Sequence, residues 1–306
     1  MFTLNKILYP TDFSRCANQA FWHAIYLSRK YKAELHMLKA IVLHEDDPYH
    51  PTSLLPDINE AHKQLKELSY QKMDYMLESY HAADIKVKKS EERGIASASV
   101  ILEYAKKNNI DLIVMGTHGR RGIKHMLLGS VAEEVVRRAF CPILTIREQT
   151  QPKRLEDLEK ILVPIDFSDH SFEALSYAKE IAIVYQAKLQ FLHVVEKIEY
   201  PAFYVTGENT IFDLVPDIKI KSIEAMKRIL KETKKPNIDL DFVVVDGYAA
   251  YEIVKYAEKH ETDLIVITTH GLTGLEHFLL GGVAEKVIRR ASCPVFTVKA
   301  FGKKLI

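Results

Sequence analysis

The sequence predicts an α/β fold that occurs twice in the chain, each time as an open, doubly wound parallel sheet. Residues 111–146 read as a buried strand, a loop with several glycines, an amphipathic helix and a second buried strand, which together form one parallel βαβ unit. The same order of residues returns at 263–298, where roughly three of every five positions are identical. A shorter pair, 6–14 and 160–168, repeats as well. The chain therefore contains two copies of one domain.

The first copy shows the alternation of strands and helices that this fold requires. Short apolar runs predict strands at 6–9, 34–41, 85–88, 112–115 and 143–146. Apolar residues at helical spacing predict helices after Ser14, at 60–80, at 97–107 and at Ser130. Residues 42–59 are rich in proline and are predicted to be irregular, so their histidines and acids are not expected to hold a metal ion.

A polar segment separates the two copies. Residues 148–158 contain Pro152 and alternate in charge, as linkers often do. We therefore expect a first domain at 1–147 and a second domain at 159–306.

The second copy follows the same order of elements. A strand is predicted at 188–194 and a helix from about Ala250 to His260. Its long loop, at about 196–217, is rich in tyrosine and phenylalanine, unlike the equivalent loop of the first copy. We interpret these rings as packing within the chain, with an apolar pocket or a dimer contact as the alternatives.

The junction between the glycine loop and the following helix carries the clearest chemical signal. Ser130 stands where an N-cap belongs and Glu133 follows three residues later, so a capping box is predicted. The amide groups of a first helical turn, together with a hydroxyl, favour an anion. The loop also contains basic side chains and no carboxylate; these are Arg120, Arg121, Lys124 and His125. Two interpretations follow, a phosphate site and an ordinary loop with a solvated basic face.

A carboxylate follows the first strand of each copy. Asp12 and its repeat Asp166 lie just beyond the carboxyl end of a central strand, where open α/β sheets bind ligands. The functional interpretation is a hydrogen bond to a ribose or a base. The alternative is a residue that only shapes the turn before the helix.

The spacing of the glycines resembles a known signature. Gly116, two residues, Gly119, nine residues and then Gly129-Ser130 resemble the nucleotide-binding signature of the universal stress protein family. The sequence Pro-Thr-Asp-Phe-Ser at 10–14 and the Cys-Pro pair at 141–142 resemble further family features. The resemblance covers nearly the whole chain, twice. It implies a tandem universal stress protein with a five-stranded, Rossmann-like sheet in each half, of the adenine nucleotide alpha hydrolase-like type.

The resemblance also implies the ligand and its contacts. Asp12 would contact adenosine, Ala40 would lie against the adenine, and the residues of the glycine signature would hold the phosphates. The full expected site comprises Pro10, Thr11, Asp12, Ala40, Gly116, His118, Gly119, Arg120, Gly129, Ser130 and Val131. The expected ligand is ATP, with or without Mg²⁺, and neither catalytic residues nor a protein metal site are predicted.

The second loop departs from the signature in three ways. Thr268 replaces Gly116, Gly282 replaces Ser130, and the basic set becomes Leu272, Thr273 and Glu276. These changes affect backbone shape, a hydroxyl and charge, and each weakens the affinity for a polyphosphate. Asp166, Gly271 and Gly281 remain. We therefore expect one tight ATP site per chain, in the first copy.

Composition limits the broad class of protein. Charged residues make up 27% of the 306 residues and leave a formal net charge of +1, which does not indicate a nucleic-acid binder. No leader segment or apolar run long enough for a bilayer is present in the sequence, so a soluble, cytoplasmic protein is expected. The three cysteines show no metal-type spacing.

Three functions remain open after these observations. The first is a nucleotide-dependent stress-response regulator with an unidentified protein partner. The second is an enzyme that hydrolyses ATP slowly, because the first loop lacks the metal-holding carboxylates of phosphoryl transfer. The third is a scaffold that binds no nucleotide. We also expect the halves to pack as a pseudo-two-fold pair near 143–146 and 294–298, and pairing of whole chains is left open.

Overall fold

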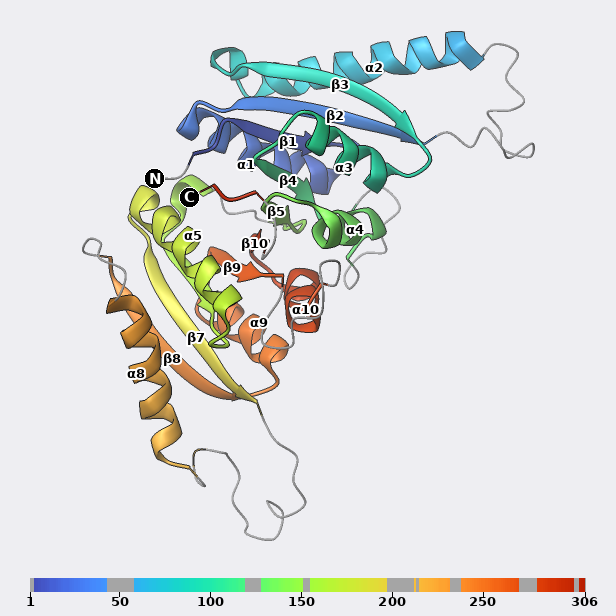
Figure 1. The fold of residues 1–306 in the computed structure, drawn as a ribbon. Helices are drawn as coiled ribbons and strands as arrows, with labels where there is room; N and C mark the ends of the chain where they lie inside the picture. The colour runs from blue at the N-terminus through green and yellow to red at the C-terminus, as the bar shows by residue number, and fades with distance from the viewer. Residues whose placement is uncertain are drawn as a thin grey trace. The chain divides into compact units, whose positions relative to one another are not determined.

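The structure is a computed structural model in which two compact units share the chain (Figure 1). One unit contains residues 3–152 together with 302–305, and the other contains residues 153–301. The residues that the structure describes are 3–42, 58–118, 128–150, 155–196, 212, 215–231, 238–269, 280–299 and 303–305.

The first unit is an open parallel sheet with helices between its strands. Its elements are β1 (Lys6–Pro10), α1 (Arg15–Tyr31), β2 (Glu34–Val42), α2 (Ile58–Ser79), the 3₁₀ helix η2 (Ala82–Asp84), β3 (Val87–Gly94), α3 (Ser97–Lys107), β4 (Leu112–Gly116), α4 (Ser130–Arg138) and β5 (Ile143–Ile146). The strand order is β3-β2-β1-β4-β5, and all four pairings are parallel.

The second unit repeats this plan. Its elements are η3 (Leu155–Asp157), β6 (Lys160–Pro164), α5 (Asp169–Tyr185), β7 (Lys188–Glu196), α8 (Asp217–Lys231), β8 (Leu240–Gly247), α9 (Ala249–Lys259), β9 (Leu264–Thr268), α10 (Gly282–Arg290) and β10 (Val295–Val298). The strand order is β8-β7-β6-β9-β10, again parallel. The predicted fold class, two tandem five-stranded Rossmann-like sheets, is confirmed.

Helices cover both faces of the first sheet, as double winding requires (Figure 1). Tyr9 of β1 contacts Phe21 of α1, with ring centroids 5.1 Å apart. His36 of β2 contacts Tyr104 of α3 on the opposite face, at 5.8 Å. Helices α3 and α4 pack against each other on that second face. A side chain of a central strand is therefore buried whichever way it points, which explains the continuous apolar runs in the sequence.

The central strands supply the core. Ile7, Leu8, Leu112 and Ile113 are at most 1% exposed. Burying each such side chain contributes about 1.5–3 kcal/mol relative to leaving it in water. These residues belong to β1 and β4, so the core includes the two strands that end at the candidate site.

One strand differs from the prediction in length. The third strand was expected near 85–88, but β3 runs from Val87 to Gly94. Its sequence is mostly charged because β3 is the edge of the sheet, where only one neighbour provides hydrogen bonds and much of the surface stays in water. The other first-copy strands and the helix at 97–107 agree with the expected positions within two residues.

Two predictions fall on residues that the structure does not describe. The irregular loop expected at 42–59 lies almost wholly outside the described residues, as does most of the aromatic loop at 196–217. The domain boundaries at 147 and 159 and the pseudo-two-fold packing of the halves stay predictions. Within the described part of the chain, no helix combines the length and apolar character needed to cross a membrane.

Candidate functional site

The carboxyl ends of β1 and β4 form the point at which the first sheet changes winding direction. These strands are neighbours, yet the chain continues from β1 towards β2 and arrives at β4 from β3 on the far side. Open α/β sheets bind ligands in the crevice at such a point. Pro10 ends β1 and Gly116 ends β4, and the two following segments meet where Ser14 Oγ donates to the carbonyl of His118 at 3.5 Å.

The turn after β1 is held by a set of short-range hydrogen bonds. Thr11 Oγ1 lies 3.1 Å from Tyr9 Oη in a hydroxyl–hydroxyl contact and accepts from the amide of Phe13 at 3.0 Å. Phe13 takes the left-handed conformation, with φ of 61°. Asp12 Oδ1 accepts from the amide of Ser14 at 2.9 Å, so the turn-shaping role of Asp12 is present. A contact of Asp12 with a ligand stays a prediction.

Ser14 begins α1 as predicted. It is the N-cap, and its Oγ accepts from the amide of Ala17 at 3.2 Å. The capping bond fixes where the helix starts, directly after the turn that carries Asp12. The positive end of the α1 dipole therefore lies at the same edge of the sheet as the carboxylate.

Gly116 is required by close packing against the first turn of α1. A Cβ at this position would lie 2.8 Å from Cys16 Sγ, 3.0 Å from Cys16 C and 3.1 Å from the amide nitrogen of Ala17. Cys16 Sγ in turn lies 3.2 Å from the carbonyl of Ile146. Burial raises the pKa of the Cys16 thiol, which favours its protonated and less nucleophilic form. Its contacts with Gly116 and with the carbonyl of Ile146 are packing contacts between α1 and the ends of β4 and β5.

Gly129 anchors the end of the signature loop to the end of β4. Its amide donates to the carbonyl of Thr117 at 2.8 Å, and a Cβ would lie 3.0 Å from that same oxygen. Its backbone is extended, with φ of −64° and ψ of 143°. The glycine is therefore needed for close approach and not for an unusual φ.

The predicted capping box at Ser130 is wrong. Gly129 is the N-cap of α4, because its backbone is extended and its carbonyl accepts from the amide of Glu133 at 2.9 Å. Ser130 is the first helical residue and makes no capping bond. Its side chain is exposed and its amide belongs to a first turn whose N–H groups have no partner inside the helix. A serine in this position offers an amide and a hydroxyl to an anion together.

Three further predicted residues lie at the same edge. His118 Nδ1 is 2.8 Å from Oγ1 of the buried Thr117, with donor and acceptor set by the tautomer. Ala40 lies near the carboxyl end of β2, in register with Glu92 of β3. Val131 is half-buried in the first turn of α4. Gly119, Arg120, Arg121, Lys124 and His125 lie outside the described residues.

The structure thus gathers seven of the eleven predicted site residues around the ends of β1 and β4. They are Pro10, Thr11, Asp12, Gly116, His118, Gly129 and Ser130. Both α1 and α4 begin at this edge, so two helix dipoles present their positive ends there. Among the described residues, no group of three or more histidine, cysteine or acidic side chains could hold a metal ion. The arrangement favours an anionic organic ligand.

Two residues that shape the site were not expected from the sequence. Tyr9 Oη bonds to Thr11 and also donates to the carbonyl of Ala17 at 2.9 Å, which ties the turn to α1. Thr117 supplies the carbonyl that receives Gly129. A comparison of the two repeats could have pointed to Tyr9. The first copy has two hydroxyl side chains, Tyr9 and Thr11, where the second has the apolar Val163 and Ile165.

The second copy keeps the backbone of this site and loses part of its chemistry. Gly281 donates to the carbonyl of Thr269 at 2.7 Å, as its counterpart does in the first copy. Asp166 Oδ1 accepts from both the amide and the hydroxyl of Ser168, at 3.0 and 2.6 Å. Gly282 would accept a Cβ without any heavy atom within 4 Å.

Comparison with known proteins gives the family. The sequence model of the universal stress protein family matches residues 3–147 and again residues 158–299. A universal stress protein of Methanocaldococcus jannaschii, MJ0531, is 38% identical over 142 residues, which are 46% of this chain and 82% of that protein. The universal stress protein E homolog of Haemophilus influenzae is 24% identical over 300 residues, or 92% of each chain. A solved universal stress protein from Archaeoglobus fulgidus has a TM-score of 0.72 at 23% identity, over 97% of this chain and 99% of that one, which supports the fold. The chain therefore belongs to the universal stress protein family and contains the family's domain twice.

Proposed function

We propose that the first copy binds an adenine nucleotide, ATP, at the carboxyl ends of β1 and β4, and that the protein acts as a nucleotide-dependent stress-response regulator. The observation that carries the proposal is the convergence of two helix N-termini on the edge where Asp12 and Ser130 lie. Backbone amides at a helix start favour phosphate, and a carboxylate beside them accepts hydrogen bonds from ribose hydroxyls.

The first-turn amides of α4 would hold the phosphate chain, with the Ser130 hydroxyl as an additional donor. The close contact between Gly129 and the Thr117 carbonyl keeps this helix start against the end of β4. Asp12 is fixed by its bond to the Ser14 amide, so its carboxylate is ordered before a ligand arrives. Preorganised groups of this kind bind with a smaller entropy cost.

Regulation is preferred over rapid ATP hydrolysis. Phosphoryl transfer needs carboxylates that hold a metal ion and a residue that positions the nucleophile. The sequence from Gly116 to Ser130 contains no acidic residue, and the described residues hold no group suited to a metal ion. We therefore expect turnover with Mg²⁺ to be slow compared with dissociation of the nucleotide.

Calorimetry on the intact chain tests the proposal. One tight ATP event per chain is expected, because only the first copy has the complete signature. Absence of binding would overturn the proposal in favour of a scaffold, and two equal events would overturn the assignment to the first copy.

Two substitutions at Asp12 separate its two roles. Asp12→Asn keeps an oxygen that can accept from the Ser14 amide but removes the charge, whereas Asp12→Ala removes both. If Asp12 contacts the ligand, both variants weaken ATP binding while the Asn variant keeps the parent's melting temperature. Parent-like binding in the Asn variant together with loss in the Ala variant would mean that Asp12 only shapes the turn.

A further inference from the structure

Residues 303–305 pack on the amino end of the first sheet, at the edge opposite the nucleotide site. We name them the 303–305 strap. They belong to the same compact unit as residues 3–152, although they follow β10 in the sequence. The amide of Thr3 donates to the carbonyl of Leu305 at 3.0 Å, and the amide of Lys303 donates to the carbonyl of Phe140 at 2.6 Å. The strap is thus bonded through its backbone to segments on both sides, as an added strand would be.

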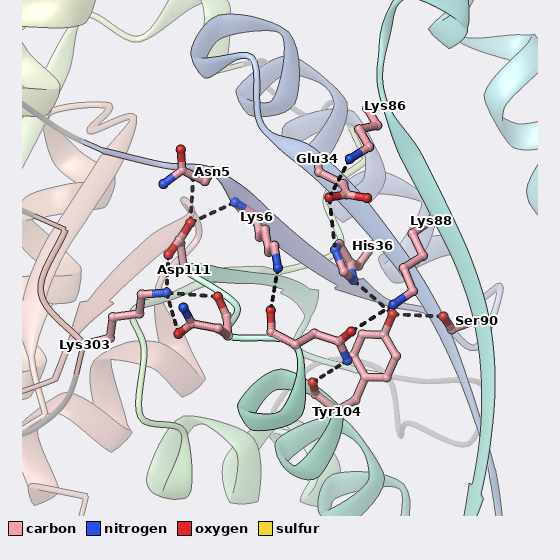
Figure 2. A network of polar contacts seen from close by, with 12 residues as sticks. Asn5, Lys6, Glu34, His36, Lys86, Lys88, Ser90, Tyr104, Asp111 and Lys303 are labelled. Atoms are coloured by element: carbon pink, nitrogen blue, oxygen red, sulfur yellow. Dashed lines mark hydrogen bonds and ion pairs between the residues drawn. The ribbon is translucent and has the colours of Figure 1, made fainter.

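The side chain of Lys303 enters a polar cluster at the start of β4. Figure 2 shows its ammonium group beside Asp111, with which it forms an ion pair. The ammonium also donates to the backbone carbonyl and to Oδ1 of Asn109, both at 2.9 Å. Three oxygens therefore receive the three protons of one lysine, which fits the compact ammonium group better than a planar guanidinium.

Asp111 is the centre of this cluster. Its side chain is 5% exposed, and its Oδ2 accepts from the amides of Asn5 and Lys6 at 2.7 and 2.8 Å (Figure 2). One buried carboxylate thereby joins the strap to the start of β1 and the start of β4. A buried carboxylate that loses its cation is strongly unfavourable, because its charge is left uncompensated away from water.

Leu305 adds an apolar anchor, since it is 4% exposed. Lys304 between the two anchors is exposed. A half-buried lysine, an exposed residue and a buried leucine form a recognition pattern, Lys-x-Leu, in which alternate side chains contact the first unit as in an extended strand.

We propose that the amino end of the first copy is a peptide-recognition site for this Lys-x-Leu pattern, and that the chain's own strap occupies it. The first copy is then completed by residues that follow the second copy in sequence. This role is separate from nucleotide binding, because the strap lies at the amino ends of the strands and the candidate nucleotide site at their carboxyl ends.

The second copy supports a role particular to the first. Asp263 repeats Asp111, and its Oδ2 accepts from the amides of Glu159 and Lys160, both at 2.9 Å. The sequence position equivalent to Lys303 is Gln151, which carries no charge. The carboxylate therefore stands in both copies, whereas the position of Lys303 is a lysine in one repeat and a glutamine in the other.

Hydrogen exchange on the full-length chain tests the proposal. Lys303→Met keeps the apolar stem and removes the ammonium group, and Lys304→Met, on the exposed neighbour, is the matched control. The Lys303 variant should exchange at least about tenfold faster at the starts of β1 and β4, with the equivalent segments of β6 and β9 unchanged. Leu305→Ala is a milder second variant and should show the same pattern. Parent-like exchange in both variants, or equal acceleration in both copies, would overturn the proposal.

A cleavable chain tests whether the strap behaves as a ligand. A protease site introduced at 300–302 allows the strap to be released from the folded protein. Cleavage and removal of the released peptide should raise exchange at β1 and β4, and a synthetic peptide of residues 302–306 should lower it again. The same peptide with aspartate at the leucine position should not. If exchange stays parent-like after mass spectrometry shows that the strap has left, the recognition site does not exist.

Discussion

The two copies share one backbone design for the signature loop but differ in the side chains around it. Gly129 and Gly281 both donate to the carbonyl of a threonine at the end of the preceding strand, Thr117 or Thr269, at 2.8 and 2.7 Å. Both glycines are N-caps with nearly the same φ and ψ. This shared geometry belongs to the fold, so a glycine at this position alone does not indicate a ligand.

The turn after the first strand has side-chain hydrogen bonds in the first copy that the second copy cannot form. In the first copy, Tyr9 and Thr11 link the turn to α1 through hydroxyl groups. The second copy has Val163 and Ile165 there, which cannot form these bonds, yet Phe167 keeps a φ of 62°. The backbone shape therefore does not depend on the hydroxyl network. The hydroxyl network is therefore a side-chain feature of the first copy that the shared backbone does not require.

Loss of the first signature is the largest effect expected from this comparison. Gly129→Ala with Ser130→Ala should weaken ATP binding by about 100-fold or more, because the new Cβ lies 3.0 Å from the Thr117 carbonyl and the hydroxyl is removed. Calorimetry on the full chain measures the change. Gly281→Ala is the control in the second copy and should leave the tight event intact. A tight event that survives the double change would place the site elsewhere.

The next largest effect is expected on stability, when Thr268 of the second copy is introduced at the equivalent position of the first, Gly116. Gly116→Thr inserts a branched side chain where even a Cβ lies 2.8 Å from Cys16 Sγ, so unfolding should become easier by about 1–3 kcal/mol. Urea denaturation measures it. Gly116→Ala should cost less, and adding Cys16→Ala should recover part of that loss, since backbone atoms at 3.0 and 3.1 Å remain. No recovery at all would mean that the backbone contacts alone decide the cost.

A buried polar cluster on the second face also differs between the copies. In the first, His36 Nδ1 lies 3.0 Å from Tyr104 Oη, which lies 2.9 Å from Ser90 Oγ (Figure 2). In the second, Gln190 Nε2 donates to Tyr256 Oη at 3.2 Å. The position accepts either side chain because both give the tyrosine hydroxyl a partner, but only the histidine titrates.

The histidine should make the first copy more sensitive to acid. Burial lowers the pKa of His36 to about 4 from its ordinary 6.5. Between these values the unfolded chain binds a proton that the folded chain does not, so stability falls as the pH drops from 6.5 towards 4. His36→Gln should flatten this dependence by about one proton. Urea denaturation between pH 7 and 4.5 measures the difference from the parent.

A second buried histidine, His23, should keep the His36→Gln variant sensitive to acid. Burial also lowers the pKa of His23 to about 4, so part of the acid sensitivity should remain in the His36 variant. His81→Asn, at an exposed residue with φ of 49°, is a control that keeps a side chain tolerated in this conformation. An unchanged pH slope in His36→Gln would show that the histidine does not contribute.

The smallest stability effect is expected at Gly282. Gly282→Ser restores the hydroxyl of the first signature, and no heavy atom lies within 4 Å of the new Cβ. The free energy of unfolding should stay within about 0.5 kcal/mol of the parent. Calorimetry should show a stronger second ATP event, although Thr268 and Glu276 still weaken it. No gain in the second event would mean that the hydroxyl is not the limiting difference.

The fold was predictable because the local signals and the repeat agree. Buried strands such as β1 and β4 read as continuous apolar runs, and the helix at 97–107 has the expected bounds. The predicted capping box was wrong because the helix begins one residue earlier than expected. Ser130 and Glu133 have the spacing of a capping box, but Gly129 is the N-cap. The choice of Gly129 as cap depends on its contact with the Thr117 carbonyl, a tertiary interaction that spacing does not report.

Most of the candidate site was located from the resemblance and the strand ends, but the strap was not. Lys303 lies in the short mixed stretch KAFGKKLI, and nothing in its neighbours indicates a partner 194 positions away. Tyr9 was read only as a strand residue, because a buried aromatic side chain gives the same pattern with or without a hydroxyl contact. Contacts between distant segments leave no period in a single sequence.

The strap also determines when, during synthesis, the first copy can form all of its contacts. Asn109 and Lys303 are 194 positions apart, so at synthesis rates of about 5–20 residues per second the first copy waits roughly 10–40 s for its last contact. During that interval Asp111 can bond to the amides of Asn5 and Lys6 but lacks its ion pair with Lys303. A domain that emerges first from the ribosome is usually the first to be finished. Here the two copies should reach their final stability together, when the strap arrives.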